Sequence, residues 1–129
     1  MNLLAIMTYE SSPIGTEISC VMHGINIEIL NNNILLKQIF LKALMEDNFK
    51  ILDEVSHIFQ PQGYTFVTLL AESHAAIHTF PEYNSLFFYL YSCRGQNDGR
   101  KTIKYLKQIL NPSHMDMSER DIVVKSTKL

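Results

Sequence analysis

The stretch from Leu70 to Tyr83 constrains this chain more than any other, because it sets ionisable side chains into a largely apolar segment. It carries a serine hydroxyl, two imidazoles and two carboxylates, contributed by Ser73, His74, His78, Glu72 and Glu82. A buried polar group costs free energy unless it is paired. The stretch is therefore either a satisfied polar cluster or a site of chemistry.

The composition is that of one globular domain. The 129 residues are 47% hydrophobic and 19% charged, with a net charge of −2, which suits a full core and gives no global field for nucleic acid. Lys101, Lys104 and Lys107 recur at every third position, a pattern that favours a solvated helix face over a phosphate-binding stripe. We expect no nucleic-acid partner.

No run of eighteen apolar residues is present, so we expect no membrane partner. The apolar start, residues 1–7, lacks a basic region, which argues against a signal peptide. Cys20 and Cys93 are the two cysteines of a chain that can build its own core. They favour a reduced, cytoplasmic protein.

Hydrophobic patterning predicts an α+β fold, in which two helices lie against one face of a mainly antiparallel sheet. One helix follows the Asn31–Asn33 start signal to about Asp47, and the other runs from Asp98, as its N-cap, to about Leu110. Strands are expected at residues 17–22, 49–59, 64–71, 75–80, 85–93 and 121–125, after an irregular arm at residues 1–14. Both faces of residues 85–93 are apolar, which indicates a sheet covered on both sides. We expect residues 1–129 to form a single domain.

A metal site or a hydrolase are the first chemical alternatives. His74 and His78 would share a face only on a helix, whereas this segment alternates and ends at Pro81. No cysteine pair or carboxylate motif completes a zinc site. Ser73 lacks the Gly-x-Ser-x-Gly setting of many hydrolases, and on a straight strand it faces away from His78. Ser73 and His78 can therefore meet only if the chain bends or breaks.

A break in the chain is the remaining alternative, because Glu72 and Ser73 stand where two extended segments join. A serine hydroxyl can attack the preceding carbonyl and form an ester. Elimination then cuts the chain and leaves dehydroalanine, which hydrolyses to a pyruvoyl group. This reaction needs an oxyanion partner, a base for the serine α-proton and a strained backbone.

Two motifs extend this interpretation. The stretch Glu72-Ser73-His74-x-x-Ile77-His78-Thr79-Phe80-Pro81-Glu82-Tyr83, followed by Cys93, resembles the signature of the prokaryotic-type S-adenosylmethionine decarboxylase proenzyme. Upstream, Phe59-Gln60-Pro61-Gln62-Gly63-x-Thr65 resembles the family's Phe-x-Pro-x-Gly-x-Ser stretch. The resemblance is strong over residues 57–95 and faint after Leu110.

The resemblance implies self-cleavage between Glu72 and Ser73, into a β chain of residues 1–72 and an α chain of residues 73–129. The only cofactor is then a pyruvoyl group derived from Ser73, which condenses with the substrate amine and acts as an electron sink, without a metal. By the same resemblance, His78 takes the serine α-proton and Thr65 supports processing in place of a serine. Cys93 protonates the substrate carbon after carbon dioxide leaves.

The resemblance also implies the substrate, S-adenosylmethionine, and a product that supplies aminopropyl groups for spermidine synthesis. Glu82 would hold the ribose hydroxyls, while Phe59 and Phe80 would flank the adenine. A carboxylate suits a cis-diol, and aromatic faces suit a purine and a sulfonium cation. The implied assembly is a homodimer of processed protomers with facing sheets.

Several residues depart from the family pattern. Phe80 replaces a tryptophan, Arg94 replaces the glycine after the cysteine, Asn84 replaces another glycine, and Glu17 stands where the family has a histidine. The changes at Phe80, Asn84 and Arg94, which surround the expected substrate, motivate an alternative. In this alternative the chain is a pyruvoyl-dependent decarboxylase of ornithine or arginine. Thr65 and the divergent N-terminus motivate another, a structural or regulatory homologue in which Ser73 remains a serine.

Overall fold

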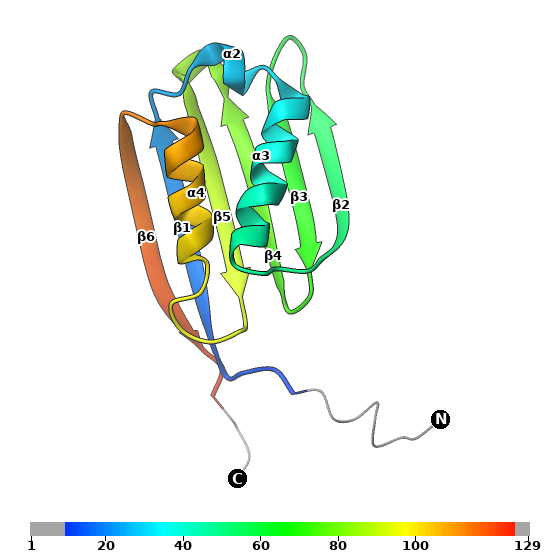
Figure 1. Cartoon of the computed structure of the whole chain (residues 1–129), viewed down its shortest axis with the longest axis vertical. Coiled ribbons are helices and arrows are strands. Elements are labelled where there is room, and N and C mark those ends of the chain that lie inside the picture. Colours follow the sequence, from blue (N-terminus) through cyan, green and yellow to red (C-terminus); the bar gives the residue numbers. More distant parts are fainter. Residues whose placement is uncertain (1–9, 126–129) are drawn as a thin grey trace.

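The computed structural model describes residues 10–125, which form one six-stranded antiparallel sheet with helices on a single face (Figure 1). The strand order is β2-β3-β4-β5-β1-β6. The strands are β1 (Ile14–His23), β2 (Ile51–Ile58), β3 (Tyr64–Leu70), β4 (Ser73–Phe80), β5 (Ser85–Ser92) and β6 (His114–Val123). The helices are α2 (Ile27–Leu30), α3 (Asn33–Glu46) and α4 (Arg100–Leu110), with a single 3-10 turn, η1 (Pro81–Tyr83).

The predicted α+β class and the two main helices are confirmed, and α2 is an addition. The last strand was predicted too short, since it starts at His114 rather than at Asp121. Residues 114–120 lie on an edge strand and contain only two apolar residues, Met115 and Met117, so their apolar alternation is too short to predict a strand. Ile14 already belongs to β1, whereas residues 1–9 of the predicted arm lie outside the described residues.

The helix starts follow from capping side chains. The Asn32 side chain accepts a hydrogen bond from Leu35 N at 3.1 Å, which confirms the predicted start of α3. The prediction of Asp98 as an N-cap was wrong, because α4 begins after Gly99, and Asp47 accepts from Thr102 N at 2.7 Å instead. The Asp98 carboxylate is occupied by other partners, which belong to the candidate site.

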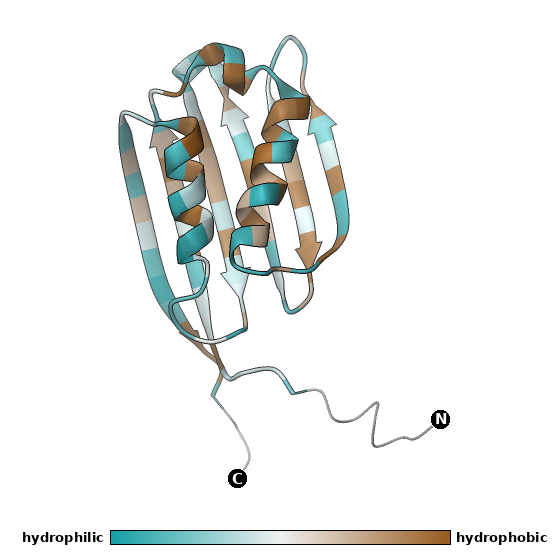
Figure 2. Cartoon of the chain, in the orientation of Figure 1, coloured by the Kyte–Doolittle hydropathy of each residue, from teal (hydrophilic) through white to brown (hydrophobic). Residues whose placement is uncertain are grey.

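The core lies between the sheet and the helices. Phe40 of α3 packs edge-on against Phe66 of β3 and Phe88 of β5, with ring centroids 5.6 and 6.1 Å apart. All three rings are buried. Figure 2 shows apolar residues concentrated on α3 and the central strands, whereas α4 and β6 are largely hydrophilic. The three lysines of α4 are exposed, as predicted for a solvated face.

The other face of the sheet is covered by no helix of the described residues, and we call it the open face. The sequence predicted a second cover for this face, and residues 10–125 do not supply one. The strand register places many apolar side chains there, namely Val21, Val55, Val67, Leu69, Ala76, Phe80, Phe87, Tyr89 and Tyr91. Within residues 10–125, no helix is long and apolar enough to cross a membrane.

Gly15 lets β1 approach the end of β5. A methyl group at this position would overlap the Ser92 carbonyl oxygen and approach the Cys93 Cα at 3.3 Å. We expect Gly15→Ala to lower the free energy of unfolding by about 1–3 kcal/mol, because backbone atoms must move. Urea denaturation measures this change. Ser19→Ala on the same strand is the control, with an effect expected within about 0.5 kcal/mol. Equal stability of the two variants would contradict the close packing.

Candidate active site

The peptide bond between Glu72 and Ser73 lies in the tight turn that joins β3 to β4. Leu70 pairs with Ser73 across this turn, so only Ala71 and Glu72 connect the strands. Glu72 has a φ of 68°, in the left-handed region that costs a non-glycine residue about 1–3 kcal/mol. The turn therefore supplies the strained backbone that the sequence analysis required for cleavage.

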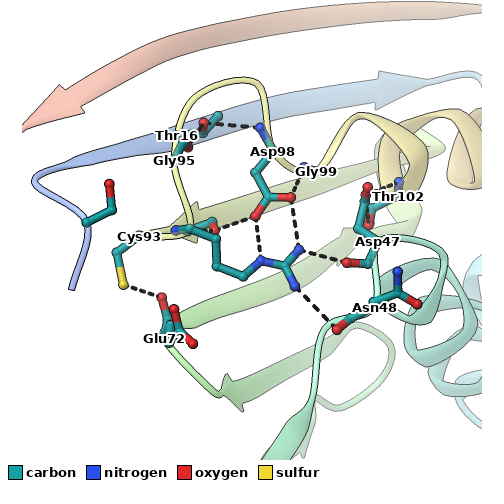
Figure 3. A network of polar contacts seen from close by, with 12 residues as sticks. Thr16, Asp47, Asn48, Glu72, Cys93, Gly95, Asp98, Gly99 and Thr102 are labelled. Atoms are coloured by element: carbon teal, nitrogen blue, oxygen red, sulfur yellow. Dashed lines mark hydrogen bonds and ion pairs between the residues drawn. The ribbon is translucent and has the colours of Figure 1, made fainter. Parts of the chain in front are cut away.

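The carbonyl oxygen of Glu72 accepts two hydrogen bonds from Cys93. The backbone N–H of Cys93 lies 3.1 Å from this oxygen and the Cys93 Sγ lies 2.6 Å from it. Figure 3 shows the thiol pointing from the end of β5 toward the turn. Two donors on one carbonyl oxygen form an oxyanion site for an attack on that carbonyl.

Ser73 begins β4, directly after this carbonyl. Its side chain lies on the helix-covered face and is 7% exposed. Among the described residues, the Ser73 hydroxyl is a buried side-chain polar atom with no hydrogen-bond partner. Burying a hydroxyl without a hydrogen-bond partner costs free energy. Such a hydroxyl is typical of a group that forms a covalent bond in a reaction.

Arg94 fastens the loop that follows Cys93 to the end of α3. Its guanidinium donates to the Asp98 carboxylate at 2.8 and 2.9 Å and to the Asp47 carbonyl oxygen at 2.7 Å. It also donates to the Asn48 carbonyl oxygen at 3.3 Å, and its Cζ lies 3.8 Å from the Phe49 ring centroid. The residue that departs from the family glycine is thus a structural anchor of the cysteine loop.

Asp98 is the centre of this network (Figure 3). It accepts from the Ser92 hydroxyl at 2.6 Å and from Gly99 N at 3.0 Å, while its own N–H donates to the Thr16 hydroxyl at 3.3 Å. Burial by itself raises the pKa of Asp98, but the hydrogen bonds from Arg94 and Ser92 outweigh burial and hold it below the ordinary value. The carboxylate is therefore charged at neutral pH.

A second group of predicted residues surrounds a pocket of about 260 Å³ at the far end of β4. The pocket is lined by Phe59, Gln62, Gly63, Thr65, His78, Thr79, Phe80 and Glu82. The Thr65 Oγ1 lies 3.0 Å from the His78 Nδ1. The structure thus brings together all the residues that the sequence analysis assigned to substrate binding, along with His78 and Thr65.

The two groups lie apart in one copy of the chain. Five residues separate Ser73 from His78 on the continuous strand β4, or about 16 Å at 3.3 Å per residue. Ser73 faces the helices, whereas His78 pairs across the open face with Thr65. The chain reverses direction at the turn before Ser73, and it does not bend between Ser73 and His78.

The metal alternative finds no support in residues 10–125, which contain no group of three His, Cys, Asp or Glu side chains placed to hold an ion. The His74 ring lies on the open face, with its centroid 5.9 and 5.6 Å from those of Tyr89 and Tyr91.

Cys20 is buried, and burial raises the pKa of its thiol to about 11. It packs as a small apolar residue, as expected.

Glu17, which stands in place of a family histidine, is held on the open face. Its carboxylate accepts from the Tyr89 hydroxyl at 2.7 Å and from Arg120 Nε at 2.9 Å. These two hydrogen bonds lower the pKa of Glu17, that from Tyr89 most. Burial and the adjacent carboxylate raise the pKa of Tyr89 to about 12.

Ser92 was not predicted from the sequence, Asp98 was wrongly predicted as an N-cap, and Arg94 stood out only as a departure from the family pattern. The position of Ser92 next to Cys93 could have marked it as a candidate site residue. Its hydrogen bond to Asp98, however, depends on the path of the loop. Gln62 was quoted only as part of a motif, and it lines the pocket.

Comparisons with known proteins agree with these motifs. The family model described as S-adenosylmethionine decarboxylase matches residues 16–121. The S-adenosylmethionine decarboxylase proenzyme of Sulfolobus acidocaldarius is 33% identical over 108 residues, which cover 84% of this chain and 88% of that protein. The proenzyme of the same name from Caldicellulosiruptor saccharolyticus is 29% identical over 106 residues, which cover 82% and 86%.

Two crystal structures share the fold. The adenosylmethionine decarboxylase from Aquifex aeolicus superposes with a TM-score of 0.81 at 23% identity, covering 92% of this chain and 98% of that one. The Trypanosoma brucei AdoMetDC-delta26 monomer gives a TM-score of 0.59 at 16% identity, covering 79% of this chain and 44% of that longer chain.

The lowered pKa of Asp98 predicts a pH-dependent contribution to stability. Asp98→Asn should reduce the free energy of unfolding at neutral pH by about 1–3 kcal/mol, because it removes the charged partner of Arg94. A carboxylate with a depressed folded pKa stabilises above its unfolded pKa of about 3.9 and loses that effect as pH falls through the folded pKa. The deficit should therefore shrink in acid.

Urea denaturation at stepwise lower pH measures this deficit. Asp53→Asn is the control, because the Asp53 carboxylate is exposed and accepts from the adjacent Glu54 N–H. A deficit for Asp98→Asn that stays constant at every pH would mean that its charge is not what stabilises the loop.

Proposed function

Because the chain belongs to the S-adenosylmethionine decarboxylase family, we propose that it is a proenzyme that cuts itself between Glu72 and Ser73 and then decarboxylates S-adenosylmethionine. The observation that carries the proposal is the Glu72 carbonyl, held at a strained turn by two donors of Cys93. Its product would supply aminopropyl groups for spermidine synthesis.

The first step is attack by the Ser73 Oγ on the Glu72 carbonyl carbon. The bond from that carbon to the Ser73 nitrogen then breaks, which leaves an ester and a free amine. Negative charge develops on the Glu72 oxygen, where the Cys93 N–H and thiol stabilise it. Release of the positive φ at Glu72 favours the same direction.

The second step is elimination. His78 takes the Ser73 α-proton, the bond from Cβ to Oγ breaks, and Glu72 leaves as a free carboxylate. The dehydroalanine tautomerises to an imine, and water converts the imine to a ketone with loss of ammonia. In the tautomer whose Nδ1–H donates to the Thr65 hydroxyl oxygen, the His78 ring is fixed and its unprotonated Nε2 is the base.

After cleavage, the β chain (residues 1–72) and the α chain (residues 73–129) remain paired, because β3 and β4 are hydrogen-bonded from Leu70–Ser73 to Thr65–His78. The pyruvoyl ketone would stand at the first residue of β4 and supply an electron sink for loss of carbon dioxide. The Cys93 thiol, which lies 2.6 Å from the Glu72 carbonyl oxygen, would return a proton to the substrate carbon.

The pocket between Phe59 and Phe80 suits the nucleoside. Both rings are half-exposed, at 48% and 43%, so each presents a face to a purine. Glu82 lies in η1 at the pocket edge, where its carboxylate can accept from two ribose hydroxyls. The pocket is too far along β4 to deliver the substrate to Ser73 of the same chain.

A homodimer resolves this separation. Two copies that pack their open faces with strands running in opposite directions place the pocket of one copy over the turn of the other. The apolar side chains of the open face, including Leu69 at 54% exposure, suit such an interface. A two-fold axis then builds two identical sites, each from both chains.

The proposed activity predicts two fragments. Intact mass under denaturing conditions should give residues 1–72 and a ketone-ended fragment from residue 73, and the cut protein should release carbon dioxide from S-adenosylmethionine. Ser73→Ala is the matched control and should stay whole, since the nucleophile is absent. Carbon dioxide release from ornithine or arginine, and none from S-adenosylmethionine, would show that the substrate is another amino acid. An uncut wild-type chain would favour the structural homologue.

The shared site predicts complementation in trans. Ser73→Ala and His78→Ala chains should each remain uncut alone, whereas co-expression should allow cleavage of the His78→Ala chain only. In the mixed dimer, its Ser73 meets the His78 of the Ser73→Ala copy. The masses of tagged chains distinguish the two. Failure of cleavage in a mixed dimer isolated by both tags would contradict a site built from two chains.

A further inference from the structure

The proposed mechanism leaves one proton without an acceptor, that of the Ser73 hydroxyl. This hydroxyl is buried and makes no hydrogen bond to any described residue. A hydroxyl that attacks a carbonyl must lose its proton during attack. A neighbouring group therefore has to accept it.

Ser92 is the direct cross-strand neighbour of Ser73. Both side chains lie on the helix-covered face, and Ser92 is fully buried. The bond from Cys93 N to the Glu72 oxygen makes the adjoining pair a hydrogen-bonded one. Ser73 and Ser92 therefore form a non-hydrogen-bonded pair, the type with Cα atoms about 4.5 Å apart and side chains closest. Hydroxyls at such positions reach each other by rotation of a side chain.

The hydrogen bonds of Ser92 leave one acceptor site free. Its hydroxyl donates to Asp98 Oδ2 at 2.6 Å and accepts from Arg94 N at 3.1 Å. A hydroxyl has one proton and two lone pairs, so a single lone pair remains. The unsatisfied donor of Ser73 and the unsatisfied acceptor of Ser92 therefore stand on directly opposed residues of β4 and β5.

We infer that Ser92 takes the Ser73 proton during self-cleavage and that Asp98 is the charged end of this path; the inference rests on the proposed function. As the Ser73 Oγ bonds to the Glu72 carbon, its proton passes to the Ser92 oxygen while the Ser92 proton passes to Asp98. When the bond from the Glu72 carbon to the Ser73 nitrogen breaks, Asp98 returns its proton to Ser92 and Ser92 passes one proton to the Ser73 nitrogen, which leaves as a neutral amine. No co-reactant is consumed.

Arg94 is a positioning residue in this path. It holds Asp98 by two hydrogen bonds and favours the anionic carboxylate. The proton that Asp98 receives from Ser92 is therefore released again quickly. Bonds that run in one direction from Ser73 through Ser92 to Asp98 polarise one another. The role differs from that of His78, which acts on the α-proton after the ester has formed.

The two roles separate experimentally in a His78→Ala background, where elimination is blocked and the ester accumulates. Hydroxylamine cleaves esters and not ordinary peptide bonds, so fragments after dilution from denaturant report the rate of ester formation. Adding Ser92→Ala should slow this rate on the order of tenfold or more. Adding Ser92→Thr, which keeps the hydroxyl, should largely restore it.

Thr68→Val in the same background is the control for loss of a buried hydroxyl. Thr68 is also fully buried and donates to the Ala75 carbonyl oxygen at 3.0 Å, away from the turn. Its ester formation should match the parent rate. If Ser92→Ala does not fold, Ser92→Cys fills the same space with a weak acceptor and should be slow as well.

An unchanged rate in Ser92→Ala or Ser92→Cys overturns the inference, as does a Ser92→Thr rate as slow as that of alanine, which would indicate a packing role. Absence of hydroxylamine-sensitive ester in the His78→Ala parent, with an uncut wild-type chain, instead refutes the proposed function itself.

Discussion

The two hydrogen bonds from Cys93 to the Glu72 carbonyl are the interaction on which the site depends. They connect the β3–β4 turn to the end of β5, and they are possible only because Ser73 pairs with Ser92 in register. A shift of one residue would turn Ser73 to the open face and move Cys93 away from the carbonyl. Strand register and turn conformation are therefore one constraint, and the proposed cleavage depends on both.

Contacts with the ends of two helices stabilise the loop that carries Cys93. Arg94 ties the cysteine loop to the carbonyls of Asp47 and Asn48, which directly follow α3, while the Asp47 side chain caps the start of α4. Cations near a helix C-terminus and carboxylates near an N-terminus are both favourable. The loop of Cys93 is therefore held by two helices whose ends meet beside it (Figure 3). A family glycine cannot make these contacts, so this chain stabilises its loop by its own means.

The sheet also explains why the candidate residues fall into two groups. A single antiparallel strand, β4, carries the proposed cleavage bond at its start and the pocket at its end. The distance is a direct consequence of strand geometry. In the proposed dimer, one copy therefore holds halves of two different sites, and the apolar open face is the surface that would join them.

The sequence by itself determined the α+β class, the central strands, the cap at Asn32 and the residues of both motifs, because these depend on local periodicity and spacing. It predicted a break at Glu72–Ser73 from the junction of two extended segments, and that break stays a prediction. Only the tertiary structure decided the partners of Asp98, the opposition of Ser73 to Ser92 and the two Cys93 donors on Glu72. Those contacts join residues 19 or more positions apart or depend on loop path, and short-range pattern carries no information about either.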